Sequence, residues 1–192
     1  PALSAELHTQ FASGLFGSLW ASTSRPRAAD DTSVELGATI GFALVVDDRW
    51  AARLGYSHYE SPGSSRPGFY QYDEFSAELR FRDRLFLGAS YSPNTSRYAP
   101  VYGPVWNRGA STFEASFQQP LADGLQGNLG IGFYDLSALF GEGYWYGSVG
   151  VGWSWRRWSL DLSWVVPDAT ARRLSYVGAA DKRFLGSASF AF

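Results

Sequence analysis

RFLGSASFAF, the stretch from residue 183 to residue 192, alternates apolar or aromatic residues with small and polar ones. Successive side chains of a β-strand point to opposite faces, so Phe184, Gly186, Ala188, Phe190 and Phe192 would share one face. A soluble edge strand rarely exposes such a face. One strand of this kind is a weak indication, and its weight depends on whether the rest of the sequence repeats the pattern.

The same alternation recurs along the whole chain. In residues 34–44 it lasts long enough to cross a bilayer as a tilted strand, which takes about 9–11 residues. No stretch approaches the ~18 consecutive apolar residues of a membrane helix. The pattern predicts eleven strands, at residues 2–10, 15–23, 34–44, 50–56, 75–81, 85–91, 113–117, 125–133, 145–153, 158–164 and 183–192.

The composition fits a closed barrel in a membrane. The 192 residues are 45% hydrophobic and 17% aromatic, yet the mean hydropathy is only -0.17, as expected when an apolar outer face is balanced by a polar lumen. The net charge of -2 indicates no nucleic-acid role, and the absence of cysteine leaves no zinc or disulfide framework. We therefore predict an all-β, transmembrane, antiparallel up-and-down β-barrel in a bacterial outer membrane, with no cofactor.

The lengths of the links between strands alternate strictly. Short links at 12–14, 47–48, 82–84, 122–124 and 156–157 separate long ones at 24–33, 61–69, 93–110, 135–143 and 167–183. Outer-membrane barrels have short periplasmic turns and longer extracellular loops, so the C-terminus is predicted to be periplasmic. No linker interrupts the pattern, which indicates one domain over residues 1–192.

The number of strands raises a question of parity. Eleven strands with a periplasmic C-terminus place Pro1 on the extracellular side, whereas single-chain bacterial barrels have even strand counts. We therefore expect a native barrel of about twelve strands, with one strand from upstream residues or a partner chain between residues 2–10 and 183–192. The chain begins at Pro1 with no visible signal peptide, and we interpret it as a processed or truncated form.

Several segments resemble known outer-membrane proteins. PAL at 1–3, SGLFGSLWAS at 13–22 and VEL at 34–36 resemble an uncharacterised proteobacterial outer-membrane family with a P-A-L strand leading into S-G-F-Y-A-G-x-W-A-S. The resemblance implies a barrel of unknown biochemical role. The family's first strand, aromatic-x-aromatic-R-G-x-S, is absent here, and no catalytic residues carry over. The C-terminal residues Phe184, Gly186, Phe190 and Phe192 resemble the signal read by the barrel-assembly machinery, a predicted partner.

Positions opposite the apolar face are predicted to line the lumen. Both signs of charge occur there, with acids in excess, so a water-filled lumen would favour cations, whereas pairing of glutamates with arginines would close it. The sequence leaves both possibilities open. The predicted lumen residues are Glu6, His8, Glu35, Arg53, Glu74, Glu78, Arg80, Glu114 and Asp161.

Basic and aromatic residues gather where the membrane surface is expected. Nine basic residues fall in or beside the predicted extracellular loops, and guanidinium groups bind phosphate bidentately, so lipopolysaccharide is a predicted partner; a generic solvated rim is the alternative. These residues are Arg25, Arg27, Arg66, Arg97, Arg108, Arg172, Arg173, Lys182 and Arg183. Tryptophans near the strand ends predict two aromatic girdles, formed by Trp20, Trp50, Trp145, Trp153, Trp155, Trp158 and Trp164.

Three functions remain open on these observations. The leading expectation is a non-enzymatic structural or partner-binding barrel, as a subunit of an assembly with another envelope protein, with the proline-rich loop 93–110 as a candidate docking site. The alternative is a narrow passive channel for small cationic solutes. The third is an outer-membrane lipid hydrolase with His58 as base and Ser61 as nucleophile, although the His-x-Ser-Asn-Gly pattern of outer-membrane phospholipases is missing.

Overall fold

The computed structural model describes residues 3–24, 33–60, 62, 71–99, 103–174 and 181–190. They form one eleven-stranded sheet in chain order, in which each strand is antiparallel to the next. The predicted all-β, up-and-down architecture is therefore confirmed. The strands are β1 (Leu3–Gln10), β2 (Leu15–Ser24), β3 (Ser33–Val45), β4 (Trp50–Glu60), β5 (Tyr72–Phe81), β6 (Leu85–Ala99), β7 (Gly103–Ala122), β8 (Leu125–Asp135), β9 (Tyr144–Trp155), β10 (Trp158–Pro167) and β11 (Arg183–Phe190).

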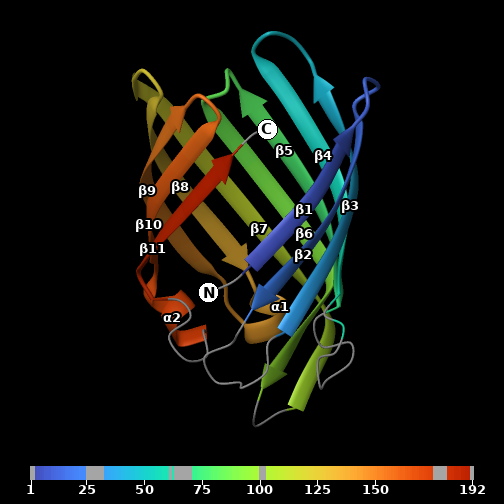
Figure 1. The fold of residues 1–192 in the computed structure, drawn as a ribbon. Helices are drawn as coiled ribbons and strands as arrows, with labels where there is room; N and C mark the ends of the chain where they lie inside the picture. Colours follow the sequence, from blue (N-terminus) through green and yellow to red (C-terminus); the bar gives the residue numbers. More distant parts are fainter. Residues whose placement is uncertain are drawn as a thin grey trace.

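The sheet is apolar on its outside. Leu54 and Leu129 on the outer face are 61% and 58% exposed, and Ile131, the next apolar residue of β8, is 54% exposed. Figure 1 shows the sheet curled into a barrel, with the short turns at the upper end and the connections after β8 and β10 beginning at the lower end. Large apolar side chains pointing outward around a polar interior define a barrel that faces lipid, so the chain is an outer-membrane β-barrel.

Two short helices lie in the long connections. Helix α1 (Ser137–Phe140) follows β8, and helix α2 (Ala169–Leu174) follows β10. Neither is long and apolar enough to span a membrane, and no other helix occurs in the described ranges. Both had been expected as plain loops, because four to six residues are too few for a helical period to stand out in the sequence.

The tight turns have local causes. Arg82 and Asp83 both adopt positive φ, at 51° and 52°, as a two-residue turn of the primed type requires. Gly124 has φ of 69°, and a Cβ there would overlap the carbonyl oxygen of Ser154. These turns match the right-handed twist of the strands they join, and the predicted short links are confirmed.

The connection between β6 and β7 differs from the prediction. Residues 93–110 are predicted as a proline-rich loop, but β6 continues to Ala99 and β7 begins at Gly103, as a hairpin that extends at the lower end of Figure 1. The register shifts between Ser92 and Thr95 and again before Arg97. Such irregularities leave backbone positions outside the ladder, which is where a strand tolerates a proline such as Pro93.

The first and last strands leave an open seam. No ladder joins β1 to β11 among the described residues, and Figure 1 shows the two strands on either side of an opening. Every described side chain of β11 is exposed. Both strands run from the long-loop end to the short-turn end, so they are parallel to one another, and a single strand running the other way would be antiparallel to both.

The seam carries a prediction about amide exchange. Unpaired N–H groups in lipid cost several kcal/mol each, so we expect a twelfth strand to cover both edges in the native membrane. Backbone amides of β1 and β11 should then exchange with deuterated water as slowly as those of β4 and β5 in native outer-membrane vesicles. Fast exchange confined to β1 and β11 would contradict the twelfth strand.

The hydrogen-bonded ladders between neighbouring strands also predict the behaviour of the protein on gels. A barrel whose backbone groups are paired within the sheet resists detergent, so the unheated protein should migrate faster than the boiled protein. Electrophoresis with and without heating measures this. Equal mobility together with a detergent-free soluble monomer would contradict the membrane barrel.

Candidate functional site

The strand register brings the predicted lumen residues to one face. Arg53 lies opposite Glu78, Glu78 opposite Gly88, and Gly88 opposite Glu114. Directly paired residues of an antiparallel ladder share a face, and this face is opposite the apolar one. All nine residues predicted to line the lumen occupy it: Glu6, His8, Glu35, Arg53, Glu74, Glu78, Arg80, Glu114 and Asp161.

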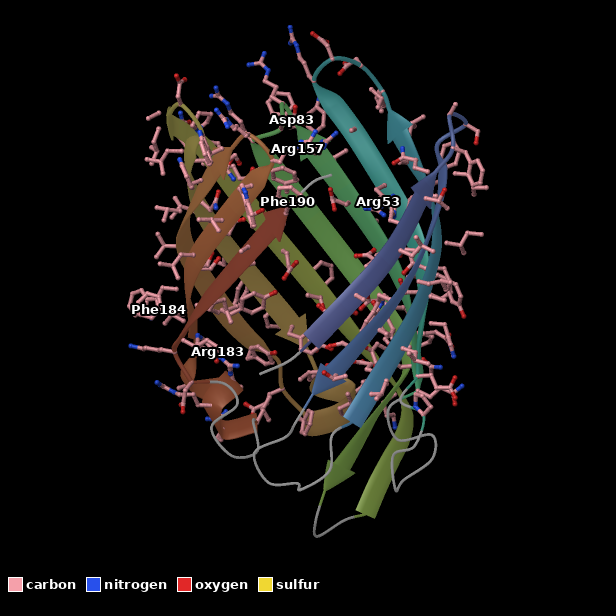
Figure 2. All side chains as sticks on the ribbon, viewed as in Figure 1. Arg53, Asp83, Arg157, Arg183, Phe184 and Phe190 are labelled. Carbon is pink, nitrogen blue, oxygen red and sulfur yellow. The ribbon has the colours of Figure 1, made fainter. Side chains whose placement is uncertain are left out.

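A cavity lies against this inner wall. It has a volume of about 300 Å³ and is lined by Arg53, Glu74, Glu78 and Glu114 together with hydroxyls of the neighbouring strands. Figure 2 labels Arg53 in the half of the barrel nearer the short turns. Three carboxylates, two from β5 and one from β7, therefore border one space inside the barrel.

A phenylalanine that points into the barrel packs against the side chain of Arg53. Phe16 is only 2% exposed, and the Arg53 guanidinium carbon lies 3.8 Å from the centre of its ring. The Phe16 ring lies over Gly41, and a Cβ on this glycine would overlap the ring. Sequence reasoning missed this residue, although its alternation with Ser18 already placed it on the polar face.

The Trp20 side chain also points into the barrel, so Trp20 does not belong to the predicted aromatic girdle on the outer face. It lies opposite Gly37, and a Cβ on that glycine would overlap the indole ring. The other tryptophans of the predicted girdles occupy the outer face by register. The glycine supplies room for the indole inside the barrel, so a position near a strand end is not sufficient to place a tryptophan at the lipid surface.

Neither lumen arginine neutralises a lumen carboxylate. Arg80 Nε lies 3.1 Å from Asp83 Oδ1 in the adjacent turn, and Arg53 stacks on Phe16. In the described part of the chain no ion pair joins either arginine to a lumen glutamate. The pairing that would have closed the lumen is therefore not formed there.

The lumen carboxylates instead accept hydrogen bonds from neutral groups. The Tyr146 hydroxyl donates to Glu114, and Ser90 Oγ donates to Glu74 Oε2 at 3.1 Å. These donors are neutral, so they do not compensate the formal charge of the carboxylates. The inner wall along β5 to β7 therefore keeps a negative charge.

A small apolar core lies at the end of the barrel that carries the long loops. Ala110, Leu136 and Leu139 are buried together, with Tyr134 and Tyr144 packed against them. Leu139 belongs to α1, so this helix folds over the inner wall rather than into solvent. Figure 1 shows α1 beneath the mouth of the barrel.

Asp168 attaches α2 to this end of the barrel. Its Oδ1 accepts from the Ala171 N–H at 2.8 Å, and its Oδ2 accepts from the Trp145 N–H at 3.0 Å. Partial burial raises the pKa of Asp168, but these backbone donors lower it more, so the pKa lies below its ordinary value. The Arg173 side chain of α2 pairs with Glu142 in the preceding connection.

This arrangement predicts the effect of Asp168→Ala. Loss of a helix N-cap costs about 1 kcal/mol, so α2 should open and trypsin should cleave faster after Arg172 and Arg173. The depressed pKa means that the stabilisation is present above the ordinary value of 3.8 and is lost as the pH falls through the folded pKa. Asp168→Asn, which keeps one carbonyl acceptor, is the control. Equal cleavage rates for all three proteins would contradict the capping role.

The predicted rim residues are only partly described. Arg25, Arg27 and Arg66 lie outside the described residues, and Arg97 belongs to β6, where its side chain is not described. The described and exposed rim residues are Arg108 on β7, Arg172 and Arg173 on α2, Lys182 just before β11, and Arg183, the first residue of β11. Their binding of lipopolysaccharide stays a prediction.

The predicted assembly signal lies on the outer face of the last strand. Phe184 and Phe190 are 71% and 44% exposed and share that face with Gly186. Figure 2 shows both phenylalanines on β11. Phe192 lies outside the described residues, so recognition by the barrel-assembly machinery stays a prediction.

His58 occupies the outer face near the loop end of β4. Its Nδ1 lies 2.8 Å from Asp73 Oδ1, and Asp73 also accepts hydrogen bonds from Tyr56 and Asn94. Sequence reasoning did not foresee this cluster, because its members come from β4, β5 and β6. Ser61, the nucleophile of the hydrolase hypothesis, lies outside the described residues. Among the described residues no group of His, Cys, Asp and Glu is placed to hold a metal ion.

Fold and lumen together define a porin-like β-barrel, and solved porins share it. A NanC porin matches 100% of this chain and 93% of its own, with 11% identity and a TM-score of 0.70. A KdgM porin matches with 10% identity over 100% and 92% of the two chains and a TM-score of 0.63. A KdgM porin in complex with disordered oligogalacturonate gives 11% identity, the same coverage and a TM-score of 0.62. No family model and no curated protein matches the chain.

These comparisons correct the expected function. A structural or partner-binding barrel had been the leading interpretation, but the solved structures that share the fold are porins. That leading interpretation is wrong, and the channel held as its alternative fits the findings better. The resemblance to an uncharacterised family stays a prediction.

Proposed function

We propose that the chain forms a narrow passive channel for small solutes, selective for cations and without catalytic activity. The observation that carries this proposal is the uncompensated charge of the inner wall, where Glu74, Glu78 and Glu114 line a cavity and no arginine pairs with them in the described residues. Carboxylates around a narrow aqueous path concentrate cations and repel anions.

The charge of the lumen also bears on the type of solute. One structural neighbour was solved with oligogalacturonate, a chain of acidic sugars. Six of the nine residues on the inner face named above are carboxylates and two are arginines, of which one is paired to Asp83 and one is stacked on Phe16. Such a lumen opposes the entry of a polyanion, so the proposed solutes are small cations rather than acidic sugars.

The surroundings of the barrel complete the proposal. Arg108, Arg172 and Lys182 are exposed at the long-loop end, where the outer leaflet would present lipopolysaccharide phosphates. We propose that they bind these phosphates, since guanidinium and ammonium groups form charge-assisted hydrogen bonds with phosphate. The outward phenylalanines of β11 would serve the assembly machinery.

Planar-bilayer recordings test the channel. With a KCl gradient across the bilayer, we expect stepwise openings and a reversal potential close to that of potassium. Liposomes that hold the heat-modifiable form supply the protein, so that silence cannot be attributed to unfolded material. Silence of that folded protein, or a reversal potential close to that of chloride, would overturn the proposal.

A further inference from the structure

Five tyrosines line the inner wall at the long-loop end of the barrel. Tyr59 and Tyr72 come from β4 and β5, and Tyr134, Tyr144 and Tyr146 come from β8 and β9. We call these five residues the tyrosine belt. All of its strands lie inside the sheet, away from the open seam, so the belt does not depend on what covers β1 and β11.

The belt consists of two groups of rings, one on β4 and β5 and one on β8 and β9. The rings of Tyr59 and Tyr72 stack at 4.4 Å with an angle of 14°, and those of Tyr134 and Tyr144 meet edge to face at 5.7 Å. Between the two groups, β6 and β7 contribute the small residues Ser92 and Ala110, both buried and paired with each other. Tyr134 and Tyr144 pack against the cluster that contains Ala110.

One tyrosine of the belt lies flat against the wall. Tyr146 is opposite Gly132, and a Cβ on this glycine would overlap the tyrosine ring. One face of the ring therefore covers the glycine, while the side chain as a whole remains half-buried. The other face is turned to the lumen, where the negative π surface of the ring is available to a solute.

Carboxylates accompany the rings. Glu114 accepts a hydrogen bond from the Tyr146 hydroxyl, and Glu74 lies two residues from Tyr72 on the same face of β5. At the same end of the barrel, Arg173 is already paired with Glu142. Arg108 is exposed on β7, beyond Ala110 in the direction of the loops. Aromatic faces and carboxylates thus border one region of the lumen.

We infer that the tyrosine belt is a binding site for small organic cations that carry an alkylammonium group. This inference rests on the proposed channel, because it names the class of solute that the channel would take up. An alkylammonium ion is attracted by aromatic faces and by carboxylates, whereas a small metal cation keeps its water shell and gains little from the rings. Neutral sugars also stack on tyrosine but leave the negative charge of the site without a counter-charge.

Choline binding to the folded barrel in detergent tests the site. We expect choline chloride to change the intrinsic fluorescence or the tyrosine NMR signals in a saturable way, and sodium chloride or glucose at equal concentration to have no such effect. The double variant Tyr59→Leu, Tyr72→Leu should bind choline roughly fivefold more weakly or worse, because two aromatic faces are lost. Tyr59→Phe with Tyr72→Phe should keep most of the affinity.

A tyrosine on the outer face provides the matched control. Tyr91→Leu removes a ring that is 49% exposed to lipid, and choline affinity should not change. The inference would be overturned if glucose bound as tightly as choline, if sodium competed equally, or if the wild-type protein failed to bind choline. Choline binding by a barrel that does not conduct would sink the channel and leave the site standing. Conduction without choline binding would overturn the binding site and leave the channel standing.

Discussion

The triple variant Glu74→Gln, Glu78→Gln, Glu114→Gln is expected to lose most of the cation preference of the channel. These three carboxylates line one cavity of about 300 Å³, and no described ion pair neutralises them. At ~10 Å and an effective dielectric constant of ~20, each charge contributes about 1–2 kcal/mol to a passing monovalent ion. Glutamine keeps the size and one acceptor oxygen, so the charge changes and the shape does not. We expect the ratio of potassium to chloride permeability to fall at least about tenfold.

Reversal potentials in a KCl gradient measure that ratio, and raising the ionic strength should shrink the difference between the two proteins because salt screens the charges. Glu60→Gln, at the end of β4 on the outer face, is the control and should leave the ratio unchanged. A triple variant as selective as the wild type would show that the lumen carboxylates do not control permeation.

The sequence predicted the strands and the lumen residues because both follow from a period of two. Whether Glu78 faces inward is decided by its position between Ala77 and Leu79, which is local information. The alternation of short and long links is equally local. A membrane barrel repeats these signals along the whole chain, so an error in one strand does not spread to the next.

The features that sequence reasoning missed depend on contacts between strands. Phe16 can point inward only because Gly41 lies beside it, and Trp20 only because Gly37 does, and these neighbours are known once the register is known. Helix α1 is four residues long and is held by Ala110 of a different element. The role of the lumen arginines likewise depends on partners, because Arg53 could pair with Glu78 opposite but stacks on Phe16 instead.

Gly41→Ala is expected to destabilise the barrel by about 1–3 kcal/mol, the usual cost of forcing an extra group into a packed interior. A Cβ at this position would overlap the backbone carbonyl oxygen of Leu54 and the ring of Phe16. The carbonyl belongs to the neighbouring strand and cannot yield without disturbing the ladder, while movement of the ring would break the stacking of Arg53. The temperature at which the heat-modifiable form is lost should fall by several degrees.

Gly17→Ala separates this local overlap from any general effect of replacing a strand glycine. Its Cβ would lie 3.6 Å from the Thr39 carbonyl oxygen, an ordinary contact, so its stability should stay near that of the wild type. Adding Phe16→Leu to Gly41→Ala should recover only part of the loss, because the Leu54 carbonyl still opposes the new methyl group. Full recovery would show that overlap with the Phe16 ring accounts for the whole loss of stability. Equal effects of Gly17→Ala and Gly41→Ala on stability would contradict the proposed overlap. Phe16 and Gly41 therefore pack as one unit, because the inward ring of Phe16 requires a glycine at position 41.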